Sequence, residues 1–227
     1  MGKSVAGEPE VGICVYCGRE EKVTRDHVIA RCLFIKPYPE NINFITVPTC
    51  EPCNNAKSRN DDFLRDWLTS DAFGSQSPQA QALFATTVAR SALRGRSEVA
   101  KRLLREAQLK PVYTRDGGYV GTFPSIPLGE DRVRAIFLPI VQGLYFDETK
   151  RRMPDDLVIK VSAYPPWQFQ NVVEALDAMG APPQRALGDV FSFTYRAVEE
   201  PRFASYWLLH FYGKVMFTVW ASEPVGG

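Results

Sequence analysis

Two short stretches decide the fold of this chain: Cys14-Val15-Tyr16-Cys17 and Cys50-Glu51-Pro52-Cys53. Each is a Cys-x-x-Cys turn, which directs both of its sulfur atoms at one point, so the two turns together can surround a tetrahedral zinc ion. A site closed by four sulfur atoms has no open position for a substrate, so we expect this zinc ion to be structural. The alternative, four unrelated buried thiols, is disfavoured because two correctly spaced pairs seldom arise by chance.

The composition sets few limits on function. The chain has 227 residues and a formal net charge of +1, which suits one large or two small domains and gives no overall attraction to nucleic acid. No apolar run approaches the roughly 20 residues that span a bilayer, and residues 1–11 lack the apolar segment of a signal peptide. Paired cysteines without a disulfide framework are typical of a reducing compartment, so we expect a cytoplasmic protein without membrane contact.

The pattern of apolar residues and turns predicts an α+β fold in three parts. Residues 1–72 contain the cysteine-bounded module, in which we expect strands over residues 22–29 and 44–49 and then a helix that begins near the second cysteine pair. Ser58, with Asp61 three residues later, resembles a capping box and predicts that a further helix begins there. A ββα unit of this size has a small core, so a zinc ion would supply much of its folding free energy.

Residues 73–110 are predicted to form basic helices, the first of which begins at Ser77-Pro78. Seven basic and two acidic side chains lie between Arg90 and Lys110, which gives a local charge of +5. Such a segment favours contacts with phosphate, although a solvated helix face has the same composition. The predicted nucleic-acid contacts are Arg90, Arg94, Lys101 and Arg105.

Residues 111–227 are predicted to form an α+β accessory domain with a largely antiparallel sheet. We expect a β-hairpin around Asp116-Gly117-Gly118 and a helix over residues 132–145 that Pro139 kinks or cuts short. The other expected elements are a helix over residues 168–179 and strands over residues 157–163, 190–195, 203–211 and 215–220. Aromatic residues alternate along the last strands, which is more typical of a core than of a base-stacking surface. This domain would select a substrate, join two copies of the chain or bind a partner protein.

Asp26-His27-Val28-Ile29 lies between the two cysteine pairs, and Asn54 and Lys57 follow the second pair closely. Together with the cysteines, this order and spacing resembles the HNH endonuclease family, the zinc-knuckled ββα-metal nucleases. The resemblance covers residues 12–60. It implies an N-terminal ββα-metal (HNH) finger with a structural zinc ion.

The resemblance also implies roles for the matching residues. His27 would be the general base that takes a proton from the attacking water, while Asp26 and Asn54 would bind a divalent cation, Mg²⁺ or Mn²⁺. Asn43, or with a poorer match Asn41, would help to fix the base. The implied substrate is DNA, most often double-stranded, and proteins of this kind commonly serve phage defence or mobile elements. The residues themselves agree with this chemistry, because imidazole is a base at neutral pH and hard oxygen ligands suit Mg²⁺.

Several features have a second interpretation. Lys57 is either a phosphate contact or a solvent-exposed lysine. Cys32, outside both pairs, is predicted to be a buried apolar thiol, and His210 is predicted to be a sheet residue and no ligand. The main alternative function is a non-catalytic zinc-finger module that binds nucleic acid or a protein, with Asp26 and His27 in structural roles. A ribonuclease that uses the same centre is the third.

Overall fold

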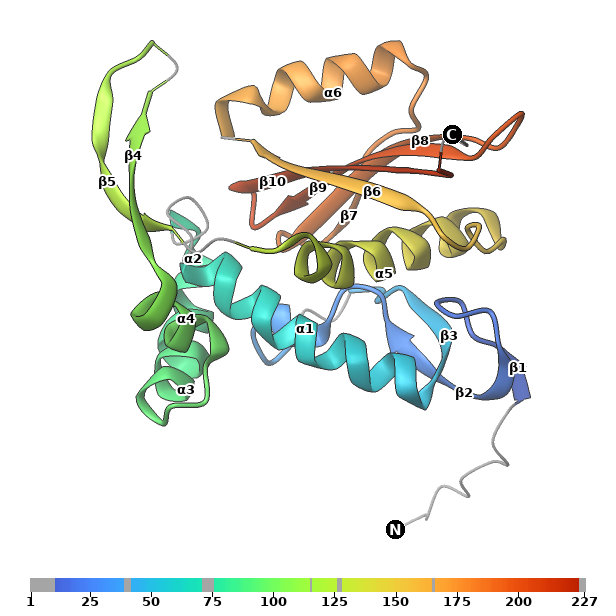
Figure 1. Cartoon of the computed structure of the whole chain (residues 1–227), viewed down its shortest axis with the longest axis horizontal. Helices are drawn as coiled ribbons and strands as arrows, with labels where there is room; N and C mark the ends of the chain where they lie inside the picture. The colour runs from blue at the N-terminus through green and yellow to red at the C-terminus, as the bar shows by residue number, and fades with distance from the viewer. Residues whose placement is uncertain are drawn as a thin grey trace.

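A three-stranded sheet, a five-stranded sheet and a separate two-stranded ribbon form the frame of the protein (Figure 1). The computed structural model describes residues 11–38, 42–70, 76–114, 116–125, 128–164 and 166–224. All strand pairs in it are antiparallel, so the predicted α+β class with mostly antiparallel sheets is confirmed for the described residues. Every helix within those ranges is too short or too polar to span a bilayer.

The middle strand of the N-terminal sheet carries Asp26 and His27. The strands of this sheet, in spatial order, are β1 (Val11–Ile13), β2 (Glu20–His27) and β3 (Thr46–Cys50). His27, the last residue of β2, lies opposite Thr46 at the start of β3. The helix α1 (Glu51–Ser70) begins at the residue after β3, so the second cysteine pair spans the junction between strand and helix.

The helix α1 runs without interruption through its 20 residues, so the second helix predicted at Ser58 is wrong. Ser58 and Asp61 lie in the middle of α1. The Asp61 carboxylate accepts hydrogen bonds from the Nζ of Lys57 at 2.9 and 3.2 Å and caps no helix. The helix continues because its buried apolar face, which includes Leu64 and Leu68, extends past Ser58 and packs into the core.

The helix α5 (Glu130–Thr149) is also continuous, although Pro139 was expected to kink it or cut it short. Proline has no N–H, so it leaves the carbonyl oxygen of Ala135, four residues earlier, without its usual helical donor. Asn60 of α1 donates a hydrogen bond from its Nδ2 to that oxygen at 3.2 Å. The neighbouring helix therefore satisfies the carbonyl group that Pro139 frees.

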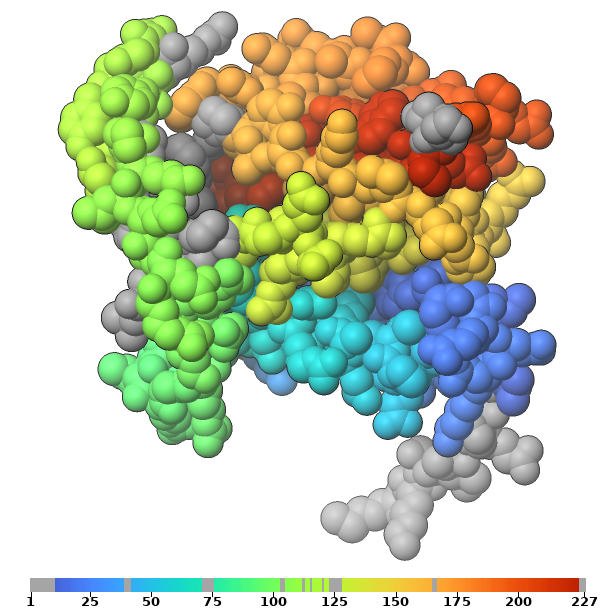
Figure 2. Space-filling view, viewed as in Figure 1, coloured from blue at the N-terminus to red at the C-terminus, as the bar shows by residue number. Residues whose placement is uncertain are grey.

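Short helices and a ribbon connect α1 to α5. The helical elements are α2 (Pro78–Leu83), a π-helical turn (Phe84–Val88), α3 (Ala89–Leu93) and α4 (Glu98–Glu106). Pro78 begins α2 as predicted, and Ser97 caps α4 by accepting a hydrogen bond from the N–H of Ala100 at 3.2 Å. The predicted hairpin is the ribbon of β4 (Gln108–Tyr113) and β5 (Tyr119–Ser125), which stands out from the rest of the molecule (Figure 2).

The C-terminal sheet has the strand order β6-β10-β9-β8-β7. Its strands are β6 (Val158–Tyr164), β7 (Arg185–Leu187), β8 (Phe191–Val198), β9 (Ala204–Phe211) and β10 (Val215–Ser222). The helix α6 (Phe169–Ala178) lies over one face of this sheet, and α5 covers the other (Figure 1). Because α5 also contacts α1 and β3, it lies between the two sheets.

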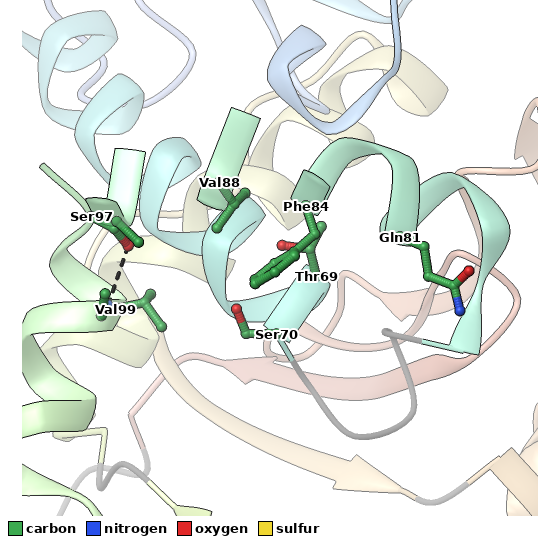
Figure 3. A pocket seen from close by; sticks show the side chains of 9 residues that line it. Thr69, Ser70, Gln81, Phe84, Val88, Ser97 and Val99 are labelled. Carbon is green, nitrogen blue, oxygen red and sulfur yellow. Dashed lines mark hydrogen bonds between the residues drawn. The ribbon is translucent and has the colours of Figure 1, made fainter. Parts of the chain in front are cut away.

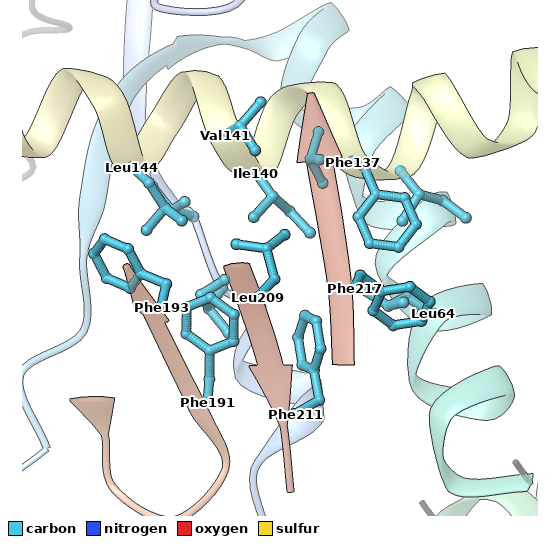
Figure 4. Packing of buried hydrophobic residues seen from close by; sticks show 14 of the residues in the cluster. Leu64, Phe137, Ile140, Val141, Leu144, Phe191, Phe193, Leu209, Phe211 and Phe217 are labelled. Carbon is cyan, nitrogen blue, oxygen red and sulfur yellow. The ribbon is translucent and has the colours of Figure 1, made fainter. Parts of the chain in front are cut away.

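One buried apolar cluster joins these layers (Figure 4). Leu64 of α1, Phe137 of α5 and Phe217 of β10 all belong to it, and the rings of Phe137 and Phe217 are 4.8 Å apart. The core interpretation of the strand aromatics is confirmed for Phe191, Phe193, Trp207, Phe211 and Phe217, which are all buried. The described parts of residues 1–72 and 111–227 therefore share one core, and the C-terminal layers support the segment that carries the cysteine pairs.

Candidate functional site

The four predicted zinc ligands meet at one point. Their sulfur atoms, from Cys14, Cys17, Cys50 and Cys53, all lie within 4.8 Å of one another. Four Zn–S bonds in a tetrahedron place the sulfur atoms about 3.8 Å apart, and the Sγ atoms of Cys17 and Cys50 are 3.7 Å apart. The donor set and its spacing therefore fit zinc, and the site would tie the turn after β1 to the start of α1.

A polar pocket of about 190 Å³ lies at the end of β2, beside this cluster. Asp26 and His27 come from β2, and Asn54 comes from the first turn of α1, directly after Cys53. The structure thus brings together three of the four residues predicted to form a catalytic centre. The remaining residues that line the pocket are Ala30, Arg31, Cys32, Ser58, Asp61 and Asp62.

Asp26 is almost buried, and neighbouring side chains hold one of its two carboxylate oxygens. Its Oδ2 accepts a hydrogen bond from the hydroxyl of Tyr16 at 2.8 Å and lies 3.5 Å from the Nζ of Lys57. Among the described residues, no side chain or backbone group forms a hydrogen bond with its Oδ1. The carboxylate is therefore fixed on one side and available to the pocket on the other.

His27 is half-buried, and its ring packs edge-on against Phe44 with the ring centres 5.4 Å apart. Burial lowers the pKa of the imidazole below its ordinary value of 6.5, and the nearby positive charge of Arg31 lowers it further. The negative charge of Asp26 opposes this shift. At neutral pH the ring is uncharged, the form in which it accepts a proton.

Asn54 is oriented by a neighbouring strand. Its Nδ2 donates a weak hydrogen bond to the hydroxyl of Thr24 at 3.4 Å, which leaves the amide oxygen free for a cation. Asn55, the next residue, is exposed and does not line the polar pocket. Of the two adjacent asparagines, Asn54 is therefore the one placed to act as a ligand.

Lys57 is buried, so the interpretation as a solvent-exposed lysine is wrong, and the phosphate contact predicted for it gains no support. Its side chain is 3% exposed, and its Nζ donates to the backbone oxygen of His27 at 2.9 Å and to the Asp61 carboxylate. An ammonium group with these partners has no position left for a phosphate. Lys57 instead ties the end of β2 to the middle of α1.

Asn43 is exposed and lies in a different concavity, which Ile42, Ile45 and Arg185 also line. The ring of His27 packs against Phe44, the residue after Asn43. The role expected for Asn43, to fix the base, is therefore not supported. The weaker candidate, Asn41, lies outside the described residues.

The sequence interpretation missed four polar residues of the pocket: Arg31, Ser58, Asp61 and Asp62. A signal was present for two of them, because Asn54, Ser58 and Asp61 are spaced by four and three residues and so share one face of a helix. Burial raises the pKa of Asp61 to about 6, while the charge of Lys57 opposes that shift. The carboxyl group of Asp61 thus titrates closer to neutral pH than an ordinary aspartate.

The basic residues predicted to contact nucleic acid lie at the other end of α1. Arg90 and Arg94 on and after α3, and Lys101 and Arg105 on α4, are all exposed. None of these four residues lines the polar pocket. Their exposure is what a phosphate contact requires, but it also fits a solvated surface.

A second pocket, of about 400 Å³, lies between the end of α1 and the short helices (Figure 3). Phe84, Val88 and Val99 supply its apolar walls, and the hydrogen bond that caps α4 lies at its edge. It carries no titratable side chain among the residues that line it. It therefore offers no general acid or base of its own.

The two single residues outside the motif also have defined places. Cys32 is partly buried, its thiol donates to the backbone oxygen of Asp61 at 3.7 Å, and burial raises its pKa to about 12. It therefore stays a protonated thiol. His210 lies within β9 and packs against Phe169 with the ring centres 4.5 Å apart, as expected of a sheet residue.

Comparison of this chain with protein-family models, with curated proteins and with solved structures finds no match.

Proposed function

We propose that the protein is a metal-dependent HNH endonuclease that hydrolyses phosphodiester bonds in double-stranded DNA. The observation that carries the proposal is the meeting of Asp26, His27 and Asn54 at one pocket, beside a cysteine cluster that fits zinc. A base, a carboxylate and an amide oxygen at one open concavity are the protein groups that single-cation hydrolysis of a phosphodiester needs.

The proposed chemistry assigns one role to each residue. Asp26 and Asn54 would hold the cation through oxygen atoms, which Mg²⁺ and Mn²⁺ prefer, and the bound cation would polarise the phosphate and stabilise the leaving oxygen. His27 takes a proton from a water molecule whose oxygen forms the new bond to phosphorus. The bond from phosphorus to the 3′ oxygen breaks, and the released 3′ oxygen takes a proton from solvent water, which leaves a 5′ phosphate and a 3′ hydroxyl. The lowered pKa of His27 supports its role, because the ring is then neutral at physiological pH.

The position of the basic helices supports a duplex as substrate. The Oγ of Ser97, at the start of α4, donates to the Oδ2 of Asp66 on α1 at 2.7 Å. This hydrogen bond attaches the basic helix α4 to the C-terminal part of α1, the helix that carries Asn54 near its start. Asn54 and Asp66 are twelve residues apart, a rise of about 18 Å along the helix. A duplex advances about 3.4 Å per base pair, so one that follows α1 would cover this distance in roughly five base pairs.

One observation favours the rival function, a zinc-binding module without catalysis. Tyr16 and Lys57 both act on Asp26, so a purely structural role for this carboxylate would also explain its burial. The two hypotheses differ in what they expect of His27, because a structural module has no use for a free imidazole beside the pocket.

A plasmid assay separates them. Zinc-loaded protein is incubated with supercoiled plasmid and Mg²⁺ or Mn²⁺, next to His27→Gln, Asp26→Asn and a parallel sample with a chelator. His210→Gln is the matched control, since His27 and His210 are the two histidines of the chain. We expect nicking or linearisation by the wild type and by His210→Gln, and none by the other variants or after chelation. Cleavage by His27→Gln at the wild-type rate would refute the nuclease proposal.

Structured RNA in the same assay tests the ribonuclease alternative. Both substrates meet the same pocket, so the ratio of the two cleavage rates decides between them. We expect the duplex to be cut faster, and faster cleavage of RNA would reassign the substrate while leaving the catalytic roles intact.

A further inference from the structure

We propose that Tyr16 is a positioning residue for the Asp26 carboxylate, so that the four-cysteine cluster controls the cation site of the polar pocket. This inference rests on the proposed function, because it assumes that Asp26 binds a cation there. It adds a partner for Asp26 that the HNH resemblance does not supply. It also assigns to the zinc cluster a part in catalysis besides its part in folding.

The place of Tyr16 in the chain is unusual. It lies inside the first Cys-x-x-Cys turn, between Cys14 and Cys17, yet its side chain leaves that turn and reaches β2. Its hydroxyl donates to the Oδ2 of Asp26 at 2.8 Å, a bond to a charged acceptor and thus one of the stronger kinds of hydrogen bond. The ring packs against the main apolar cluster.

The contacts of Asp26 determine which oxygen faces the pocket. Both Tyr16 and Lys57 act on Oδ2, at 2.8 and 3.5 Å. With Oδ2 held in this way, Oδ1 is the oxygen that can reach a cation, and Asp26 lines the pocket. A carboxylate held at one oxygen loses little rotational freedom when it binds a cation through the other, and outer partners of this kind typically raise metal affinity.

Zinc binding by the cysteine cluster would affect Tyr16 through the backbone of the first Cys-x-x-Cys turn. The N–H of Cys14 bonds to the oxygen of Arg19, and the N–H of Gly18 bonds to the oxygen of Cys14, both at 2.9 Å. The N–H of Val15 bonds to the oxygen of Pro48, in the middle of β3, at 3.0 Å. A zinc ion that holds Cys14 and Cys17 on either side of Tyr16 fixes the start of its side chain. With the backbone held and the ring packed against the apolar cluster, the hydroxyl is kept where it meets Asp26.

The test measures cation binding directly, without relying on cleavage. Zinc-loaded wild type and Tyr16→Phe are titrated with Mn²⁺, and free Mn²⁺ is followed by electron paramagnetic resonance. Tyr145→Phe is the matched control, because it also removes a tyrosine hydroxyl bonded to a carboxylate, that of Glu199 at 2.6 Å, away from the polar pocket. Zinc content and melting temperature are measured for each variant.

We expect Tyr16→Phe to keep its zinc and to bind Mn²⁺ about 10- to 100-fold more weakly, with Tyr145→Phe at the wild-type affinity. In the nicking assay, half-saturation by Mn²⁺ should shift by the same factor, and excess Mn²⁺ should restore the rate. Equal Mn²⁺ affinity of Tyr16→Phe and wild type, or loss of zinc from Tyr16→Phe, would overturn the inference. Tight Mn²⁺ binding that depends on Tyr16 in a wild type that cuts no nucleic acid would instead refute the proposed function and leave the inference standing.

Discussion

Gly143 of α5 lies directly against Val28, the residue that follows His27. A Cβ atom on Gly143 would lie 2.6 Å from one methyl carbon of Val28 and 2.8 Å from the other. Such distances leave no room for a larger side chain unless Val28 moves. The C-terminal half of the protein therefore supports the end of β2 through a contact that requires glycine.

Gly143→Ala should destabilise the protein and disturb the polar pocket. Overpacking of a core costs about 1–3 kcal/mol, which outweighs the gain of up to about 1 kcal/mol from replacing a helical glycine by alanine. Urea denaturation measures the change. The double variant with Val28→Ala should lose less unfolding free energy than the sum of the losses in the two single variants. Additive losses would show that there is no steric conflict between residues 143 and 28.

Lys57→Met should lower the free energy of unfolding by about 3–5 kcal/mol, because it leaves the carboxylates of Asp26 and Asp61 without their buried cation. Lys150→Met is the matched control: Lys150 also pairs with an aspartate one turn away, Asp147 at 3.2 Å, but its side chain is 72% exposed. The exposed pair should contribute at most about 1 kcal/mol. Similar losses of unfolding free energy in the two variants would contradict the structural role that we assign to Lys57.

Cys53→Ser should lose the zinc ion and melt at a lower temperature than the wild type, because the cluster needs all four thiolates. Native mass spectrometry measures the metal content. Cys32→Ser should keep one zinc ion, since the Sγ of Cys32 bonds to the backbone of Asp61 and takes no part in the cluster. Zinc retained by Cys53→Ser, or lost from Cys32→Ser, would show that the ligand set is different.

His210 should make the protein less stable in mild acid. Burial lowers its pKa in the folded state below the ordinary value of 6.5, so the unfolded chain binds more protons as the pH falls through 6.5. Its contribution to stability is therefore complete above pH 6.5 and is lost as the pH falls toward the folded-state pKa. Melting curves of wild type and His210→Gln between pH 8 and pH 5 should show a smaller loss for the variant. Parallel curves would mean that the histidine titrates equally in both states.

The elements and the zinc ligands could be predicted because their signals are local. Two turns of four residues define the cluster, and apolar periodicity located β6, β8, β9 and β10 within a few residues but missed the short edge strand β7. The continuity of α1 and α5 was not predictable in the same way. A capping pattern at Ser58 and a proline at 139 both argue locally for a break, and packing between the two helices overrides them.

The polar pocket could be predicted only in part for the same reason. Asp26, His27 and Asn54 belong to one compact pattern, whereas the burial of Lys57 depends on how closely α1 packs against the end of β2. The hydrogen bond between Tyr16 and Asp26 joins the first cysteine turn to β2, and no sequence pattern predicts that these two residues meet. Residues such as Lys57 and Tyr16, which hold a site residue from a different helix or turn, cannot be identified from the sequence pattern.

The most direct test of the account is chemical rescue of the proposed base. Wild type, His27→Ala and Asp26→Asn are assayed for Mg²⁺-dependent nicking of supercoiled plasmid with and without added imidazole, and each protein is checked for zinc. We predict that imidazole restores part of the activity of His27→Ala, because it can enter the space of the missing ring, and that it leaves Asp26→Asn inactive. Activity of His27→Ala equal to wild type without imidazole, or a wild type that never nicks DNA with either Mg²⁺ or Mn²⁺, would contradict the proposal that this pocket is a nuclease centre.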